Sequence, residues 1–368
     1  MPLLLDQDHI AQLADMKQCM QFVEKSIRSL ALEQSFAQPH VRVQTPVGDN
    51  TTYWSNIMSG GDKSLDTFAI RINSALNQDA EIGGLKRSQF LGQRSQGLIL
   101  TYSLSTGELL CIFPDFDISG LRVGATQGLG SQVLAKRDAQ RVAVLGSGKL
   151  ARTSLEAVSL VRKLTEVRVY SPNGAHREDF ARAMEPLLPC SVQPVESAEQ
   201  AVNGSEIIIA ATNSNEPVLK GEWLTPGMQI NSVMGGHVAD KENRPVVTRM
   251  ELDLKCYERS DRVVQTSVKH ADFPIEGWGD MGFAIQQAAV RKEDVQGLDE
   301  IMAGMQPGRQ SEEEVILFKG ISNAVQFAAV GGWLYQAARD RGLGEEISDR
   351  WFSTDLRKWT DRGFMPSP

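Results

Sequence analysis

Residues 141–157 read Arg-Val-Ala-Val-Leu-Gly-Ser-Gly-Lys-Leu-Ala-Arg-Thr-Ser-Leu-Glu-Ala, and their pattern indicates the fold class. Val142–Leu145 form a short apolar run with the length of one buried parallel strand. Gly146 and Gly148 follow at once, and a helical pattern begins directly after them. The first N–H groups and the dipole of such a helix attract an anion. A strand, a glycine turn and a helix in this order therefore predict a dinucleotide phosphate site.

The turn has the spacing G-x-G-x-x-A, and each small residue has a distinct purpose in such a site. Gly146 permits a tight turn, Gly148 lets the backbone approach a pyrophosphate, and Ala151 lets the helix pack on the strand. The alternative is an α/β turn that binds no ligand. We predict that the cofactor contacts are Gly146, Ser147, Gly148, Lys149, Leu150 and Ala151.

The residues that follow alternate between apolar strands and helices. The strands are predicted at 167–170, 191–195, 206–210 and 229–233, with a helix over 176–187 and another that Ser197 caps. This alternation specifies a doubly wound parallel sheet, the Rossmann architecture, which binds ligands at the carboxyl ends of its strands. Further cofactor contacts are therefore predicted there: Ser171, Asn173, Arg177, Ala211, Thr212, Asn213, Val233, Met234 and Gly235.

The second strand of the sheet informs the choice between NAD(H) and NADP(H). An NAD site usually has an Asp or Glu after this strand, which binds the ribose 2′-hydroxyl. Here Tyr170 is followed by Ser171-Pro-Asn-Gly-Ala-His-Arg177, and the first acid is Glu178. We expect NADP(H), with Arg177 near the 2′-phosphate; NAD(H) is the alternative, with Arg177 facing solvent.

The first part of the chain has a different pattern. Residues 6–35 indicate a packed helix pair. Short β-like runs then occupy 41–43, 67–73, 97–103 and 108–113, separated by turns that include Gly60-Gly61 and Ser105–Gly107. A glycine-rich helix is predicted over 119–136, and so many glycines in one helix suggest close approach to another backbone or a ligand. Residues 315–340 are predicted to return to helix.

Three arginines of this region are candidate carboxylate ligands. Arg42 and Arg71 lie inside strand-like runs, and Arg122 is near the start of the glycine-rich helix. The guanidinium fork donates two parallel hydrogen bonds to a carboxylate. We expect the three to converge on an anion, although a strand arginine commonly just faces solvent.

Composition limits the class of protein. The 368 residues are enough for two domains, with 41% hydrophobic and 23% charged residues. A net charge of −8 argues against a nucleic-acid surface.

The four cysteines, Cys19, Cys111, Cys190 and Cys256, are scattered along the chain, which favours buried thiols in a reducing compartment over a metal site. The opening Met-Pro-Leu-Leu-Leu-Asp turns acidic too soon for a signal peptide, and no apolar run reaches membrane length. We expect a cytosolic protein with no membrane partner.

Several motifs, in order over about residues 5–345, resemble the ornithine cyclodeaminase/μ-crystallin family. They are Ile118–Arg122, Gly146–Gly148, Ala151-Arg152, Glu156-Ala157, Ala211-Thr212, Pro217-Val218, Leu224–Gly227, Asn231–Gly236, Pro307–Arg309 and Phe318-Lys319. The resemblance implies an α/β protein in which a Rossmann domain is inserted in a mixed α+β substrate and dimerisation domain. We expect residues 1–136 in the first part of that domain, 137–314 in the Rossmann domain, and 315–368 packing back as a helix and tail. A homodimer is also implied.

The resemblance also assigns roles by position. Arg42 and Arg122 match the carboxylate-binding arginines of the family, and Arg71 stands where a substrate-contacting lysine is usual. His237 stands where cyclodeaminases have a catalytic aspartate. Phe327 replaces another common aspartate and Ser322 replaces a glycine.

These departures decide which activity is expected. Histidine transfers protons near neutral pH, but as imidazolium it repels an iminium, so ornithine cyclisation is disfavoured. We predict an NAD(P)H-dependent imine reductase or amino-acid dehydrogenase for a small α-imino or α-keto carboxylate. Its catalytic residues would be His237, Arg71 and Asp240, with Arg42, Arg71 and Arg122 binding substrate. The alternatives are a redox-neutral cyclodeaminase and a μ-crystallin-like carrier that binds NADPH or a small ligand without turnover.

Overall fold

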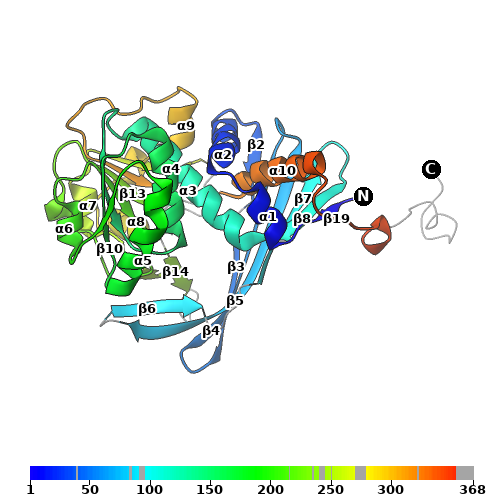
Figure 1. Ribbon diagram of the computed structural model, residues 1–368, viewed down its shortest axis with the longest axis horizontal. Helices are drawn as coiled ribbons and strands as arrows, with labels where there is room; N and C mark the ends of the chain where they lie inside the picture. Colours follow the sequence, from blue (N-terminus) through cyan, green and yellow to red (C-terminus); the bar gives the residue numbers. More distant parts are fainter. Residues whose placement is uncertain are drawn as a thin grey trace.

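The computed structural model describes residues 1–38, 40–82, 85–90, 96–214, 216–233, 236–239, 245–249, 251–269, 279–320 and 323–353. Two sheet-containing domains lie side by side, joined by the long helix α3 (Asp115–Leu134). The first domain combines both ends of the described chain, drawn in blue, cyan and orange in Figure 1, and the second contains the green and yellow middle. This agrees with the predicted insertion.

The first domain contains a largely antiparallel sheet. Its described strands follow the order β19-β1-β8-β7-β5-β4-β2, while β3 pairs with β4 and β6 with β5. The bounds are β1 Leu3–Leu4, β2 Ser35–Ala37, β3 Val41–Gly48, β4 Thr51–Asp62, β5 Thr67–Ile82, β6 Leu85–Phe90, β7 Gln96–Ser103, β8 Leu109–Pro114 and β19 Glu345–Glu346. β19 pairs with β1, and β1 runs parallel to β8, so both ends of the described chain join one sheet.

One prediction for this sheet was wrong. Gly60-Gly61 is not a turn but part of the long strand β4. A Cβ at Gly60 would lie 2.9 Å from the Phe36 carbonyl oxygen, and one at Gly61 would lie 2.7 Å from the Phe36 ring. The two glycines therefore let β2 approach β4 closely.

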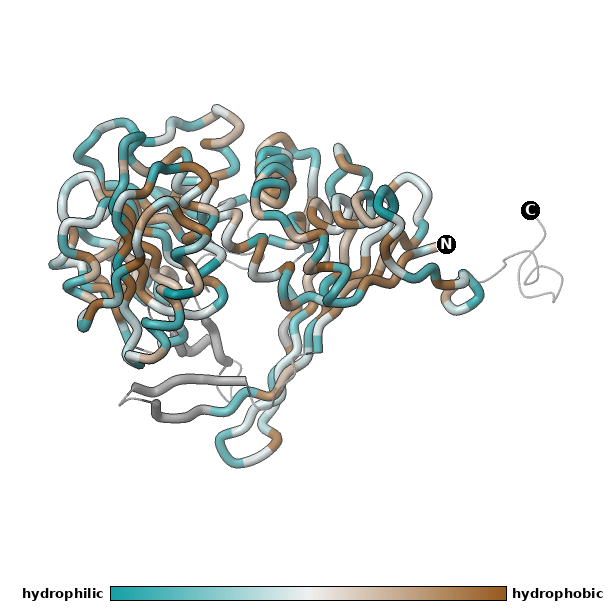
Figure 2. Tube along the Cα trace, viewed as in Figure 1, coloured by the Kyte–Doolittle hydropathy of each residue, from teal (hydrophilic) through white to brown (hydrophobic). Residues whose placement is uncertain are grey.

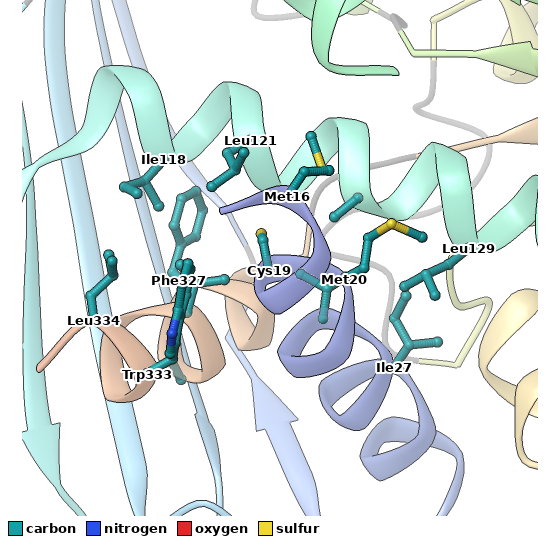
Figure 3. Close-up of a cluster of buried hydrophobic side chains, with 14 of the residues drawn as sticks. Met16, Cys19, Met20, Ile27, Ile118, Leu121, Leu129, Phe327, Trp333 and Leu334 are labelled. Carbon is teal, nitrogen blue, oxygen red and sulfur yellow. The ribbon is translucent and has the colours of Figure 1, made fainter. Parts of the chain in front are cut away.

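Three helices, α1 (Gln7–Leu13), α2 (Met16–Ala31) and α10 (Ala324–Arg341), belong to this domain. Asp6, Asp15 and Asn323 cap their N-termini by accepting backbone N–H bonds. Figure 3 shows their apolar side chains meeting those of α3: Met16, Cys19, Met20 and Ile27 from α2, Ile118, Leu121 and Leu129 from α3, and Phe327, Trp333 and Leu334 from α10. The predicted helix pair over 6–35 is thus α1 and α2, followed by β2.

The glycines of α3 explain how the two domains join. Gly124 and Gly128 face α4 (Lys149–Val161) of the second domain, where an added Cβ would lie 2.5 Å from Thr153 backbone and 2.7 Å from Ala157 Cβ, respectively. Gly130 faces Phe318 in the same domain. The predicted close approach to another backbone is confirmed, and it fixes the first turn of α3 beside the start of α4.

The second domain contains a parallel sheet with the described order β11-β10-β9-β12-β13-β18-β16-β17. Its strands are β9 Arg141–Leu145, β10 Glu166–Tyr170, β11 Val192–Pro194, β12 Ile207–Ala210, β13 Gln229–Ser232, β16 Arg262–Gln265, β17 Gln296–Gly297 and β18 Ile316–Lys319. Their helices are α4, α5 Gly174–Met184, α6 Ala198–Val202, α7 Leu254–Glu258, α8 Gly279–Gln286 and α9 Leu298–Met302. The chain adds β10 and β11 on one side of β9 and then β12 and β13 on the other, so the strand order reverses between β9 and β12. A doubly wound sheet binds its ligand at this point. Figure 2 shows these strands as an apolar centre within a hydrophilic surface.

Two features of this domain differ from the predictions. Residues 316–319, expected in a helix, form the buried strand β18 between β13 and β16. The Rossmann domain therefore extends beyond the predicted boundary at residue 314. A short hairpin of β14 (Gly236–Ala239) and β15 (Pro245–Arg249), which was not predicted, follows β13.

Candidate functional site

The predicted phosphate turn forms a tight glycine turn that leads directly into α4. Gly146 has φ +118°, and a Cβ there would collide with the Ala211 carbonyl oxygen, so only glycine fits. Gly148 is the N-cap of α4, without a side-chain capping bond, and an added Cβ at Gly148 would meet nothing within 4 Å. Ala151 is fully buried against the strand. The first N–H groups of α4 thus lie beside open space, where they can donate to an anion.

A buried carboxylate orders the neighbouring strand ends. Glu251 accepts the backbone N–H of Thr212 at Oε1 (3.1 Å) and that of Val233 at Oε2 (3.1 Å). Ser232 Oγ donates to the same Oε2 at 2.6 Å, and Glu251 is completely buried. Glu251 therefore links the ends of β12 and β13, where cofactor contacts were predicted.

A lysine extends this network to the next strand. Lys319, at the end of β18, donates from Nζ to Ser232 Oγ (2.6 Å) and to Asp280 Oδ1 (2.7 Å). Both charged side chains are buried, so their pairing offsets the cost of removing them from water. The ends of β12, β13 and β18 are thus linked by Glu251, Asp280 and Lys319, for which the sequence predicted no role.

The end of β10 carries the groups predicted to select the cofactor. Arg177 is buried and donates from Nη1 to the Ser171 carbonyl (2.8 Å) and from Nη2 to Glu196 Oε2 (2.7 Å). Glu196 follows β11 and is 81% exposed. Arg177 therefore does not face solvent, and an acid that lies far from β10 in sequence reaches this end of the sheet. Asn173 caps α5 by accepting the His176 N–H at 3.3 Å.

Two of the three predicted substrate arginines converge on one aromatic ring. The guanidinium carbons of Arg71 (β5) and Arg122 (α3) lie 5.4 and 4.5 Å from the centroid of the Phe327 ring on α10. Both arginines are buried. Arg122 donates from Nη1 to Gln326 Oε1 (3.1 Å) and from Nη2 to Ser119 Oγ (3.3 Å). Arg71 pairs with Asp115 Oδ2 at 2.7 Å. The Phe327 ring therefore lies against two guanidinium groups, at the position where the family resemblance places an aspartate.

Lys149 connects this arginine cluster to the phosphate turn. Its ammonium donates to the Phe116 carbonyl and lies 3.0 Å from the Phe116 ring centroid. Burial lowers the pKa of Lys149 from 10.5 to about 8, against the opposing influence of Asp117 and Asp115, while Arg122 and Arg71 lower it further. The residues that would bind cofactor and substrate therefore influence one another electrostatically.

The remaining predicted residues are placed only in part. Arg42 pairs with Asn56 in the β3–β4 ladder, and His237 pairs with Val247 in the β14–β15 hairpin. The side chains of both lie outside the described part of the structure. Met234, Gly235, Asp240 and Ser322 lie wholly outside it. Ser147, Leu150, Ala211 and Asn213 lie at the carboxyl edge of the parallel sheet, as predicted.

The family signature defined for ornithine cyclodeaminase/mu-crystallin proteins matches residues 2–342. The chain belongs to this family.

Members of the family with assigned activities resemble the chain over most of its length. A Delta(1)-pyrroline-2-carboxylate reductase of Bacillus cereus is 24% identical over 346 residues, which are 94% of this chain and 99% of the relative. An alanine dehydrogenase of Archaeoglobus fulgidus is 26% identical over 350 residues, 94% and 98% of the two chains. The structure of Thermococcus litoralis Delta(1)-pyrroline-2-carboxylate reductase, in complex with NADH and L-proline, matches with a TM-score of 0.79 and 26% identity. The match covers 94% of this chain and 100% of that one.

Among the helices described here, none has the length and hydropathy needed to cross a membrane.

Proposed function

We propose that this protein is an NAD(P)H-dependent imine reductase or amino-acid dehydrogenase that acts on a small α-imino or α-keto carboxylate. The observation that carries the proposal is the pair of buried arginines, Arg71 and Arg122, beside Lys149 of the phosphate turn. The family relatives that reduce pyrroline-2-carboxylate or act on alanine all transform a carbon that bears both nitrogen and carboxylate. This substrate pattern suits a cationic site next to a nicotinamide.

Separate residues would bind the substrate carboxylate and transfer the proton. Arg122, fixed by Gln326 and Ser119, donates a forked pair of hydrogen bonds to the substrate carboxylate, with Arg42 as the second donor. The apolar Phe327 wall excludes water from one side of the site, which strengthens these bonds. The bound cofactor supplies the hydride. His237 supplies or holds the proton at the substrate nitrogen, with Asp240 orienting it.

We also propose NADP(H) as the preferred cofactor, with NAD(H) accepted. Arg177, in the first turn of α5, contacts the Ser171 carbonyl just after β10, where the adenosine ribose of a Rossmann cofactor binds. Its partner Glu196 is 81% exposed, so that carboxylate can turn to solvent and leave Arg177 to bind a 2′-phosphate.

We also propose that the protein forms a homodimer. Val41, Ile57, Ile72 and Leu98 lie directly opposite one another on four adjacent strands, β3, β4, β5 and β7. All four side chains are exposed, so they form an apolar row on the outer face of the sheet. A self-complementary row of this kind suits a two-fold interface between copies of this chain.

The test is nicotinamide absorbance on mixing the protein and NADPH or NADH with cyclic ketimines, or with α-keto acids plus ammonia or methylamine. We expect net loss of absorbance, and Arg122→Ala should raise the substrate KM while leaving cofactor affinity unchanged. Ammonia release from ornithine without net absorbance change would instead indicate a cyclodeaminase. Cofactor binding with no turnover across the panel would favour the carrier.

A further inference from the structure

Asp115 and Arg71 form a buried ion pair whose hydrogen-bonding capacity is only partly used. Their relative exposures are 5% and 8%, and the pair is made through one carboxylate oxygen, Oδ2, and one guanidinium nitrogen, Nη2. A structural ion pair of these two groups usually forms two parallel bonds. The single bond here leaves one side of each group for another partner.

One hydrogen-bond donor and one acceptor of the Arg71–Asp115 ion pair are left without a partner in the described part of the chain. Among the residues that the structure describes, Asp115 Oδ1 and Arg71 Nε have no hydrogen-bond partner. Arg71 Nη1 contacts the Met58 sulfur at 3.6 Å, which is a weak acceptor. Buried polar atoms without partners are rare, because each one forfeits its hydration. A ligand that offers an acceptor and a donor on neighbouring atoms would satisfy both.

The start of α3 and the neighbouring strand β7 determine where Asp115 lies. Asp115 is the first residue of α3, where the helix dipole stabilises a carboxylate. Gly97 on β7 makes room for it, because an added Cβ would lie 2.9 Å from Asp115 Cβ and 3.1 Å from Oδ2. Arg71 is held against Phe327 on its other side. The pair therefore adjoins the same ring that Arg122 contacts.

We propose that Asp115 is a specificity-determining residue that binds the substrate nitrogen. Its Oδ1 accepts the N–H of a protonated imine or an ammonium, while Arg71 donates to the adjacent carboxylate. In reduction, hydride adds to the imine carbon and the C=N π pair moves to nitrogen, so the step needs no proton from Asp115. This inference rests on the proposed function, and it narrows the substrates to cationic α-nitrogen carboxylates.

The experiment compares ligands that differ only at the nitrogen. L-proline is paired with (S)-tetrahydrofuran-2-carboxylate, and L-alanine with L-lactate. Each binds to the protein saturated with reduced cofactor, so no chemistry occurs, and calorimetry gives the dissociation constants. A hydrogen bond to a charged group predicts that the wild type prefers the nitrogen ligand roughly 10- to 100-fold. Asp115→Asn should abolish that preference.

Two further variants separate this role from a structural one. Asp117→Asn removes the same charge from the same helical turn at an exposed position, and should keep the preference. Gly97→Ala keeps both charges but displaces the Asp115 carboxylate, and should reduce the preference if the protein retains its Tm.

The outcomes are distinguishable. A preference that survives Asp115→Asn, or a wild type that binds both ligands of a pair equally, overturns the role of Asp115 while the carboxylate site stands. Failure of the wild type to bind either ligand of any pair contradicts the proposed function itself, and the inference with it.

Discussion

At the scale of single residues, the proposed preference for NADP(H) rests on Arg177 and its contact with Glu196. We expect Arg177→Ala to weaken NADPH binding about tenfold or more while changing NADH binding little, because a charged hydrogen bond to phosphate contributes about 1.5–3 kcal/mol. Glu196→Gln should have the opposite effect on NADPH, since it frees Arg177. Fluorescence titrations with both cofactors measure this. Equal losses for NADH and NADPH in Arg177→Ala would show that Arg177 only supports the fold.

The shifted pKa of Lys149 makes the free energy of unfolding depend on pH. Its pKa is lowered from 10.5 to about 8 in the folded chain, mainly by burial. Between these values the unfolded chain binds a proton that the folded chain does not, so the Lys149 contribution to the free energy of unfolding increases as pH rises. Urea unfolding at about pH 7 and about pH 10 should therefore show the wild type gaining stability relative to Lys149→Met. A difference that stays constant with pH would contradict the shifted pKa.

The position of a residue in the fold was predictable where it belongs to a contiguous sequence motif. The glycine turn identified Gly146, Gly148 and Ala151 because strand, turn and helix are contiguous. Asp115, Glu196 and Glu251 were missed because nothing near them in sequence distinguishes them from ordinary helix caps or surface acids. Only the fold brings Glu196 to Arg177, and Glu251 to the ends of β12 and β13.

At the scale of elements, the packing of α3 on α4 depends on glycine. In Gly128→Ala the new Cβ would lie 2.7 Å from Ala157 Cβ. Overpacking of this kind costs about 1–3 kcal/mol, more than the ~1 kcal/mol that alanine gains over glycine in a helix. We expect lower stability in chemical denaturation, and partial recovery in the double variant with Ala157→Gly. An additive double variant would mean that the two positions do not touch.

Elements were predictable where periodicity and caps agreed, and not where an apolar run was short. Ile316–Lys319 lies next to the apolar helix α10, and periodicity alone does not separate a buried strand from a buried helix. Gly60-Gly61 resembled a turn because glycine commonly breaks strands, whereas here it accommodates Phe36. Both errors arise from tertiary contacts that local sequence does not encode.

At the scale of the whole molecule, the exposed apolar row predicts the assembly. Ile72→Lys places a charge in the centre of the row formed with Val41, Ile57 and Leu98, and should convert a dimer to a monomer. Leu160→Lys is the matched control, because Leu160 is 50% exposed on α4, away from the sheet. Light scattering after size exclusion reports the mass. A dimer that persists in Ile72→Lys would place the interface elsewhere.

Hydride transfer to a carbon that carries nitrogen and carboxylate can be followed with an isotope label. The protein is supplied with NADPH or NADH deuterated at the transferable C4 position, together with a cyclic ketimine carboxylate. Mass spectrometry and NMR of the product then locate the label. We predict one deuterium at Cα of the resulting amino acid, with one cofactor oxidised per product. An amino acid without deuterium at Cα, or no amino acid despite bound cofactor, would contradict hydride transfer to that carbon.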